Sequence, residues 1–236
     1  MFIHITDFYI DEKKHSVVDH LRFDLVQESA RIAFYEKTPG VYWTHSKVSL
    51  FPYDRCVHFK VVRDILQSKN TKNNDVLVLG GGAESVPCVT AILRNVRKVD
   101  SVEINTKISE IGANYFLPLI KNTDSAKIFQ INSDAFDFVK ESKSKYDFIF
   151  IDLFIDGRLP KQLFSKAFLN GLHRILKKDG IIFFNFAAEI DNVRKNMQKL
   201  YSSFPNFCLY KHNKHYLVYY IGINMDNKFQ DYNKVI

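Results

Sequence analysis

Cysteine is scarce in this sequence. Cys56, Cys88 and Cys208 are the only three among 236 residues, and they are far apart in the chain. Three scattered thiols provide neither a disulfide framework nor the paired spacing of a metal site. We therefore expect a reducing, cytoplasmic compartment and no bound metal.

Long apolar runs are missing as well. No segment approaches the roughly 18 consecutive apolar residues of a membrane span. Met1–Asp7 does not combine a basic stretch with an apolar core, so we expect no secretory signal. The sequence has no internal repeat and no low-complexity linker. With 46% hydrophobic and 25% charged residues, it is typical of one large globular domain, or of a domain with a small appendage.

The net charge is +7, but the positive residues are not concentrated. An excess of this size could favour nucleic acid or an anionic substrate. The lysines are spread through the expected loops, however, and no strong basic cluster is interleaved with aromatic residues. We therefore expect neither nucleic acid nor a membrane as a partner, whereas a homodimer stays open.

The segment Asp75–Glu84 predicts a buried strand that runs into a glycine turn. The apolar run Val76–Leu79 is typical of a parallel strand covered on both faces. Gly80–Gly82 then allow the backbone to turn sharply and to approach a ligand closely. A helix over Glu84–Leu93 can follow, with Pro87 in its first turn. On its own, a glycine cluster is also compatible with a simple tight turn.

A second apolar strand carries a carboxylate near its end. Glu103 belongs to Val99–Ile104 and lies 23 positions after Gly80. This distance is close to the spacing at which a nucleotide-binding fold places an acid on the ribose hydroxyls.

From Asp75 onward, strands and helices alternate, which predicts a doubly wound, Rossmann-like α/β fold. The predicted strands are Val76–Leu79, Val99–Ile104, Lys127–Asn132, Phe148–Leu153 and Ile181–Phe186. The predicted helices are Glu84–Leu93, Thr106–Phe116, Ala135–Glu141, Leu163–Leu176 and Asn192–Phe204. Lys178–Gly180 is expected to be a turn. Cys208–Tyr210 and Tyr216–Ile223 are expected to form a closing antiparallel pair.

Residues 1–52 predict a small β-rich N-terminal subdomain. Four segments in it are rich in β-branched and aromatic residues: Phe2–Ile10, Leu21–Val26, Arg31–Tyr35 and Val41–Leu50. Apolar residues at helical spacing over Tyr53–Gln67 open the α/β domain, which we expect to extend over residues 53–224. Residues 225–236 are expected to be a polar tail.

In such sheets, ligands bind beyond the carboxyl ends of the strands. Four groups lie at successive predicted strand ends: Gly80–Gly82, Glu103, Asp134 and Asp152. Each has a structural alternative, because Glu103 could be a solvated acid, Asp134 a helix N-cap and Asp152 a turn residue. The occurrence of all four at successive strand ends favours a binding site.

Five motifs occur in a fixed order along the chain: Gly80-Gly81-Gly82, Val102-Glu103-Ile104, Ser133-Asp134-Ala135, Tyr146–Asp152 and Leu176–Gly180. In this order they resemble the spermidine synthase family, within the class I S-adenosylmethionine-dependent methyltransferase superfamily. The resemblance extends over Tyr53–Phe186, and the β-rich N-terminus fits the small β domain of that family.

The resemblance implies a role for each matching residue. Glu103 would accept hydrogen bonds from both ribose hydroxyls of S-adenosylmethionine or its decarboxylated form, because a carboxylate has two oxygens. Asp134 would bind the adenine amino group, and the glycine backbone would approach the sulfonium tail. Asp152 would be the catalytic residue that orients and deprotonates the attacking nucleophile. The implied donor-binding residues are Gly80, Gly81, Gly82, Glu103, Asp134 and Ala135.

The sequence departs from that family around the acceptor. Ala83 stands where the family has an aspartate that pairs with the ammonium group of the donor. Asp54–Lys60 keeps only the first acid of the family's acidic stretch and adds two cations. Since a diamine dication needs acids around it, we expect a neutral or anionic acceptor. The candidate acceptor residues are Asp156, Arg158 and Tyr53, although Arg158 could also be a solvated loop cation.

We therefore expect a spermidine-synthase-like transferase. It would bind S-adenosylmethionine or its decarboxylated form and transfer an aminopropyl or methyl group to a small-molecule nucleophile other than an ordinary diamine. Two alternatives stay open. A nucleoside-binding protein without catalysis would keep Glu103 and Asp134 while Asp152 is solvated. A nucleic-acid methyltransferase would show a continuous basic face and strongly salt-dependent binding.

Overall fold

The computed structural model describes most of the 236-residue chain. The described residues are 3–10, 13–20, 23–24, 27–36, 42–49, 62–64, 66–67, 71–82, 84–116, 124–155, 158–186, 190–204, 207–212, 218–223 and 233–234. Before residue 62 and after residue 204, only the backbone is described.

The first fifty residues contain a five-stranded antiparallel sheet. Its strands are β1 (Ile3–Ile10), β2 (Lys13–His20), β3 (Phe23–Asp24), β4 (Gln27–Glu36) and β5 (Tyr42–Ser49). The order is β1-β2-β4-β3, and β5 pairs with the other side of β4. The sequence did not predict β2, because its segment Lys13–His20 carries only two adjacent apolar residues among polar ones.

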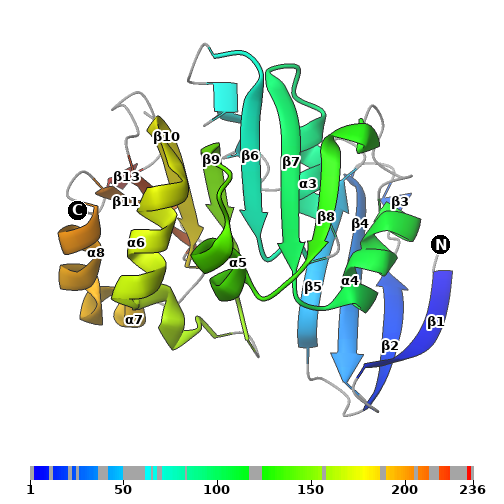
Figure 1. Cartoon of the computed structure of the whole chain (residues 1–236). Coiled ribbons are helices and arrows are strands. Elements are labelled where there is room, and N and C mark those ends of the chain that lie inside the picture. Colours follow the sequence, from blue (N-terminus) through cyan, green and yellow to red (C-terminus); the bar gives the residue numbers. More distant parts are fainter. Residues whose placement is uncertain are drawn as a thin grey trace.

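A second sheet of eight strands forms the body of the molecule (Figure 1). Its order is β13-β11-β12-β10-β9-β6-β7-β8. Five neighbours, β10-β9-β6-β7-β8, are parallel, and β12 joins β10 in the antiparallel direction. The parallel strands are β6 (Asn74–Leu79), β7 (Val96–Glu103), β8 (Ile128–Asn132), β9 (Tyr146–Ile151) and β10 (Leu176–Asn185). The doubly wound α/β class predicted from the sequence is confirmed.

The antiparallel end of the large sheet uses the C-terminal part of the chain. Its strands are β11 (Phe207–His212), β12 (Val218–Ile223) and β13 (Asn233–Lys234). The predicted pairing of β11 with β12 is confirmed. β13 pairs with β11 at Tyr210 and Lys211, so part of the expected polar tail adds a short edge strand.

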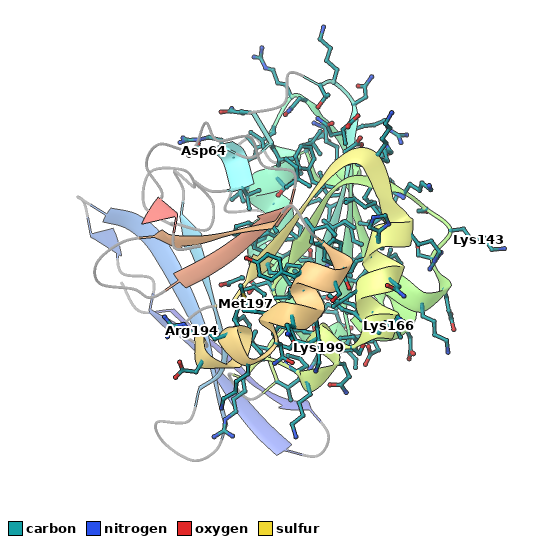
Figure 2. All side chains as sticks on the ribbon, turned by 90° about the vertical axis from the view of Figure 1, so that its left-hand side faces the viewer. Asp64, Lys143, Lys166, Arg194, Met197 and Lys199 are labelled. Carbon is teal, nitrogen blue, oxygen red and sulfur yellow. The ribbon has the colours of Figure 1, made fainter. Side chains whose placement is uncertain are left out.

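Helices cover both faces of the parallel strands. In chain order, the helical elements are α3 (Ser85–Ala91), α4 (Thr106–Ile111), η1 (Gly112–Phe116), η3 (Ser125–Lys127), α5 (Ala135–Glu141), η4 (Lys161–Phe164), α6 (Lys166–Ile175), α7 (Ile190–Lys195) and α8 (Met197–Ser203). Figures 1 and 2 show α5, α6 and α8 on one face and α3 on the other. This two-sided cover explains why the central strands are apolar at consecutive positions.

The core under α5, α6 and α8 follows directly from sequence periodicity. Phe168, Leu169, Leu172 and Ile175 recur at helical spacing in α6 and are all buried. They pack against alternate residues of the strands, including Leu77, Ile149 and Ile182. Lys166 of α6, Arg194 of α7 and Lys199 of α8 are exposed, and Figure 2 labels all three.

Two local predictions were wrong. Lys178–Gly180 is not a separate turn, because β10 includes it. The pairing with β9 steps from Leu176↔Tyr146 to Ile181↔Phe148, so Lys177–Gly180 form a bulge opposite Asp147. The helix predicted over Asn192–Phe204 is divided into α7 and α8.

Candidate functional site

The glycine turn after β6 packs closely on its neighbouring strands. The N–H groups of Gly80 and Gly81 both donate to the Val102 carbonyl oxygen, at 2.9 and 3.0 Å, and the Asp152 N–H donates to the Leu79 carbonyl oxygen at 2.8 Å. A Cβ atom on Gly80 would lie 2.3 Å from the Asp152 carbonyl oxygen. Gly80 also has a φ of +85°, so only glycine fits here without strain.

Glu103 binds the last glycine of this turn through its carboxylate. Its Oε2 accepts from the Gly82 N–H at 2.9 Å, and its Oε1 accepts from the Asn105 N–H at 3.0 Å. Each carboxylate oxygen can accept more than one hydrogen bond. The structure thus brings Gly80–Gly82 and Glu103 together, with a partly exposed carboxylate at the edge of the sheet. Two hydroxyl groups of a ribose are suitable donors to such a carboxylate.

Asp152 follows β9 at the same edge of the sheet. Its Oδ1 accepts from the Asn185 Nδ2 at 2.8 Å. Burial raises the pKa of Asp152 to about 6, and the negative charge of Glu103 acts in the same direction, while the hydrogen bond from Asn185 opposes both. A carboxyl group with this pKa is mostly ionised at pH 7 and can accept a proton.

Asp134 caps a helix, which is the structural alternative that the sequence left open for it. It is the N-cap of α5, and its Oδ1 accepts from the Phe136 N–H at 2.7 Å. Ala135, the first residue of the helix, is buried. The cap uses only the Oδ1 atom of Asp134, so the second oxygen could still accept a hydrogen bond from an adenine amino group. That role stays a prediction.

The acceptor side is described only in part. Ile155 and Arg158 exchange two backbone hydrogen bonds of 2.9 Å, which places the exposed Arg158 beside Ile155, shortly after Asp152. The other expected acceptor residues, Asp156 and Tyr53, lie outside the described residues, as does Ala83.

Two residues near the site were missed from the sequence. Asn185 ends β10 and contacts Asp152; a polar residue after the apolar run Ile181–Phe184 could have revealed it. Glu84 ends the glycine turn in a left-handed conformation with a fully buried side chain. A large polar residue two positions after a glycine cluster gives no local signal of burial.

Among the described residues, His, Cys, Asp and Glu side chains form no group of three or more that could hold a metal ion. The same part of the chain contains no helix with the length and apolar character needed to cross a membrane.

Residues 58–221 match the family model of the spermine/spermidine synthase domain. The chain belongs to this family. The match covers the glycine turn, Glu103, Asp134 and Asp152, so the resemblance found in the five motifs is confirmed.

Relatives of known identity agree with this assignment. The polyamine aminopropyltransferase of Vibrio vulnificus is 27% identical over 164 residues, which are 66% of this chain and 54% of the relative. The chain spans about half the length of the curated relatives it matches.

Solved structures support the fold. A spermidine synthase in complex with the transition-state analogue AdoDATO has a TM-score of 0.69 at 16% identity, covering 98% of this chain and 75% of its own. Human methyltransferase-like protein 13 in complex with SAH has a TM-score of 0.58 at 19% identity, covering 74% of this chain and 84% of its own. Both synthases and methyltransferases therefore share the architecture of this chain.

Proposed function

We propose that this protein binds S-adenosylmethionine or its decarboxylated form and transfers an aminopropyl or methyl group to a small-molecule nucleophile. The observation that supports this most strongly is the contact of Glu103 with the Gly82 N–H. It joins a glycine turn and a carboxylate at the carboxyl ends of the parallel strands, and Asp152, directly after the neighbouring strand β9, bonds to Leu79 before the turn.

In this proposal, each part of the donor has a protein partner. Glu103 accepts from the ribose hydroxyls, and Asp134 with Ala135 meets the adenine. The backbone of Gly80–Gly82 would lie along the sulfonium tail. A Cβ atom on Gly80 would collide with the Asp152 carbonyl group, and one on Gly81 with the Ser101 Oγ. The transition-state analogue bound to the related spermidine synthase and the SAH bound to the methyltransferase are ligands of the kind that this site would take.

The proposed reaction is a displacement at a carbon next to the sulfonium. The lone pair of the nucleophile forms a bond to this carbon. The carbon–sulfur bond breaks, and its electron pair stays on sulfur, which leaves as a neutral thioether. The Asp152 carboxylate takes the proton that the nucleophile loses. Because the sulfonium is already a good leaving group, positioning of the two reactants supplies much of the rate.

The proposed acceptor is neutral or anionic and is not an ordinary diamine. In the sequence, the acidic stretch that the family uses near the acceptor has largely been replaced, and Ala83 stands in the place of an acid. Arg158 is an exposed cation shortly after Asp152. A guanidinium there suits a carboxylate on the acceptor or the donor.

Donor choice and reaction type can be tested together. Because Ala83 cannot pair with an ammonium group, we expect calorimetric titration to show a preference for the decarboxylated donor of less than about 100-fold. Incubation with both donors and a metabolite mixture should release 5′-methylthioadenosine if the aminopropyl group is transferred, and S-adenosylhomocysteine if the methyl group is transferred. A stronger preference, with rapid aminopropylation of putrescine, would contradict the proposed acceptor and restore ordinary spermidine synthesis.

A further inference from the structure

Glu84 ends the glycine turn and leads into α3. Its N–H donates to the Gly81 carbonyl oxygen at 2.9 Å, and its own carbonyl oxygen accepts from the Cys88 N–H at 2.9 Å. Its φ is +64°, a left-handed conformation that residues other than glycine rarely adopt. The residue is completely buried.

The side chain of Glu84 reaches back beneath the turn to two strands. Its Oε1 accepts from Nε2 of Gln130 on β8 at 3.1 Å, and the same Nε2 donates to the Ser109 carbonyl oxygen at 3.2 Å. Ser101 on β7 lies under the turn as well. A Cβ atom on Gly81 would come within 2.1 Å of the Ser101 Oγ and 3.4 Å of the Glu84 Oε1.

Two buried oxygen atoms of these side chains have no hydrogen-bond partner among the described residues: Oε2 of Glu84 and Oγ of Ser101. Buried polar atoms are normally paired, and each exception in a native protein calls for an explanation. Glu84 thus combines a left-handed backbone, a fully buried carboxyl group and an unpaired oxygen. Each of these features destabilises the fold locally, and such strained residues are concentrated at functional sites.

We propose that Glu84 is a positioning residue of the donor site, which as a neutral carboxylic acid fastens the glycine turn to β7 and β8. In this form its O–H donates to the Ser101 Oγ, which pairs both orphan oxygens at once. Its carbonyl oxygen accepts from Gln130. The turn is then held at two points. Glu84 connects it to Ser101 and Gln130, and Glu103 accepts from the Gly82 N–H.

The charges around Glu84 favour the neutral form. Burial, first of all, raises its pKa, and the negative charge of Glu103 on β7 does the same, against the hydrogen-bonding groups of Ser101, Gln130 and Ser109. The other titratable group that faces it is the Cys88 thiol on α3, whose pKa is raised by burial and by Glu84. No cation is among these neighbours in the described part of the chain.

This inference rests on the proposed function, because a loosened turn would release the Gly82 N–H from Glu103 and leave that carboxylate poorly oriented for ribose. Two variants of Glu84 separate this role from a purely structural one. Glu84→Gln keeps the shape, accepts from Gln130 and donates to Ser101 without a charge. Glu84→Gly suits the left-handed backbone but removes the tether.

The experiment measures 5′-methylthioadenosine binding by calorimetry, together with the melting temperature of each protein. We expect Glu84→Gln to bind within about twofold of wild type. We expect Glu84→Gly to melt at or above the wild-type temperature, because strain and a buried carboxyl group are removed, and to bind about tenfold more weakly. Gln130 is exposed on β8, and Gln130→Leu removes its hydrogen bond to Glu84. This variant should also bind 5′-methylthioadenosine about tenfold more weakly.

Wild-type affinity in Glu84→Gly and Gln130→Leu would overturn the inference and leave the proposed function intact. An equal loss of affinity in Glu84→Gln and Glu84→Gly would overturn the neutral-acid role. If wild type itself does not bind 5′-methylthioadenosine, the proposed function fails, and the donor role of Glu84 fails with it.

Discussion

At the scale of single residues, Asp152 is set apart by its surroundings. A hydrogen bond from Asn185 fixes one of its oxygens, while burial and the nearby Glu103 raise its pKa to about 6. A group that ionises close to neutral pH can take a proton and release it again, which is the property that a general base needs. The donor contacts, in contrast, are proposed for Glu103 and Asp134.

We expect Asp152→Asn to lower the turnover rate by roughly 10²–10⁴-fold, the usual contribution of general acid–base catalysis. Donor affinity should change little. In wild type, the rate should fall as the pH drops below about 6, because the protonated carboxyl group cannot act as a base. Turnover against pH in the wild type and the variant checks both points.

Asp156→Asn tests the rival assignment, since Asp156 is the next acid in the sequence after Asp152. Full activity in Asp152→Asn, combined with loss of activity in Asp156→Asn, would move the catalytic role to the loop. An unchanged pH profile in Asp152→Asn would also argue against Asp152 as the base.

At the scale of elements, the amino ends of four strands are joined by charges. The Lys177 Nζ lies 3.1 Å from the Asp75 Oδ2 and 2.7 Å from the Asp147 Oδ2, so it links the bulge of β10 to β6 and β9. Arg97 on β7 pairs with Asp75 as well. Burial alone would raise the pKa of Asp75, but hydrogen bonds and charges from Arg97 and Lys177 lower it below its ordinary value.

We expect Lys177→Met to lower the free energy of unfolding at pH 7 by about 0.5–1 kcal/mol, since the pair is partly exposed to solvent. A carboxylate with a depressed folded-state pKa stabilises the fold above its unfolded pKa of about 4, and this contribution disappears as the pH falls through the folded-state value. The difference between variant and wild type should therefore shrink in denaturant titrations below pH 4. If the unfolding free energies of Lys177→Met and wild type differ by the same amount at pH 7 and pH 2.5, the effect comes from packing and not from the ion pairs.

The elements differ in how well local sequence predicted them. Apolar runs such as Val76–Leu79 gave the parallel strands, and the Asp134 cap gave the exact limits of α5. β2 was missed, because its pairing with β1 and β4 stabilises a polar segment. The bulge in β10 was also missed, since the register between two strands depends on both of them. A polar residue after an apolar run marks Asn185, but local sequence does not show that its partner is Asp152, 33 positions earlier in the chain.

At the scale of the whole molecule, topology assembles the site. β6 lies between β7 and β9 in the sheet, although β9 comes much later in the chain. Figure 1 shows β6 between β7 and β9. The glycine turn after β6 is therefore flanked by Glu103 from β7 on one side and by Asp152 after β9 on the other. Open parallel sheets bind their ligands at such a point.

The central claim is that this edge of the sheet binds the nucleoside part of the donor through Glu103. Calorimetric titration with 5′-methylthioadenosine of wild type, Glu103→Ala and the exposed control Glu141→Ala tests it most directly. We expect binding by wild type and by Glu141→Ala, and a loss of about 1.5–3 kcal/mol in Glu103→Ala, the usual cost of a hydrogen bond to a charged group. Equal affinity in all three proteins would remove Glu103 from the site and contradict the account.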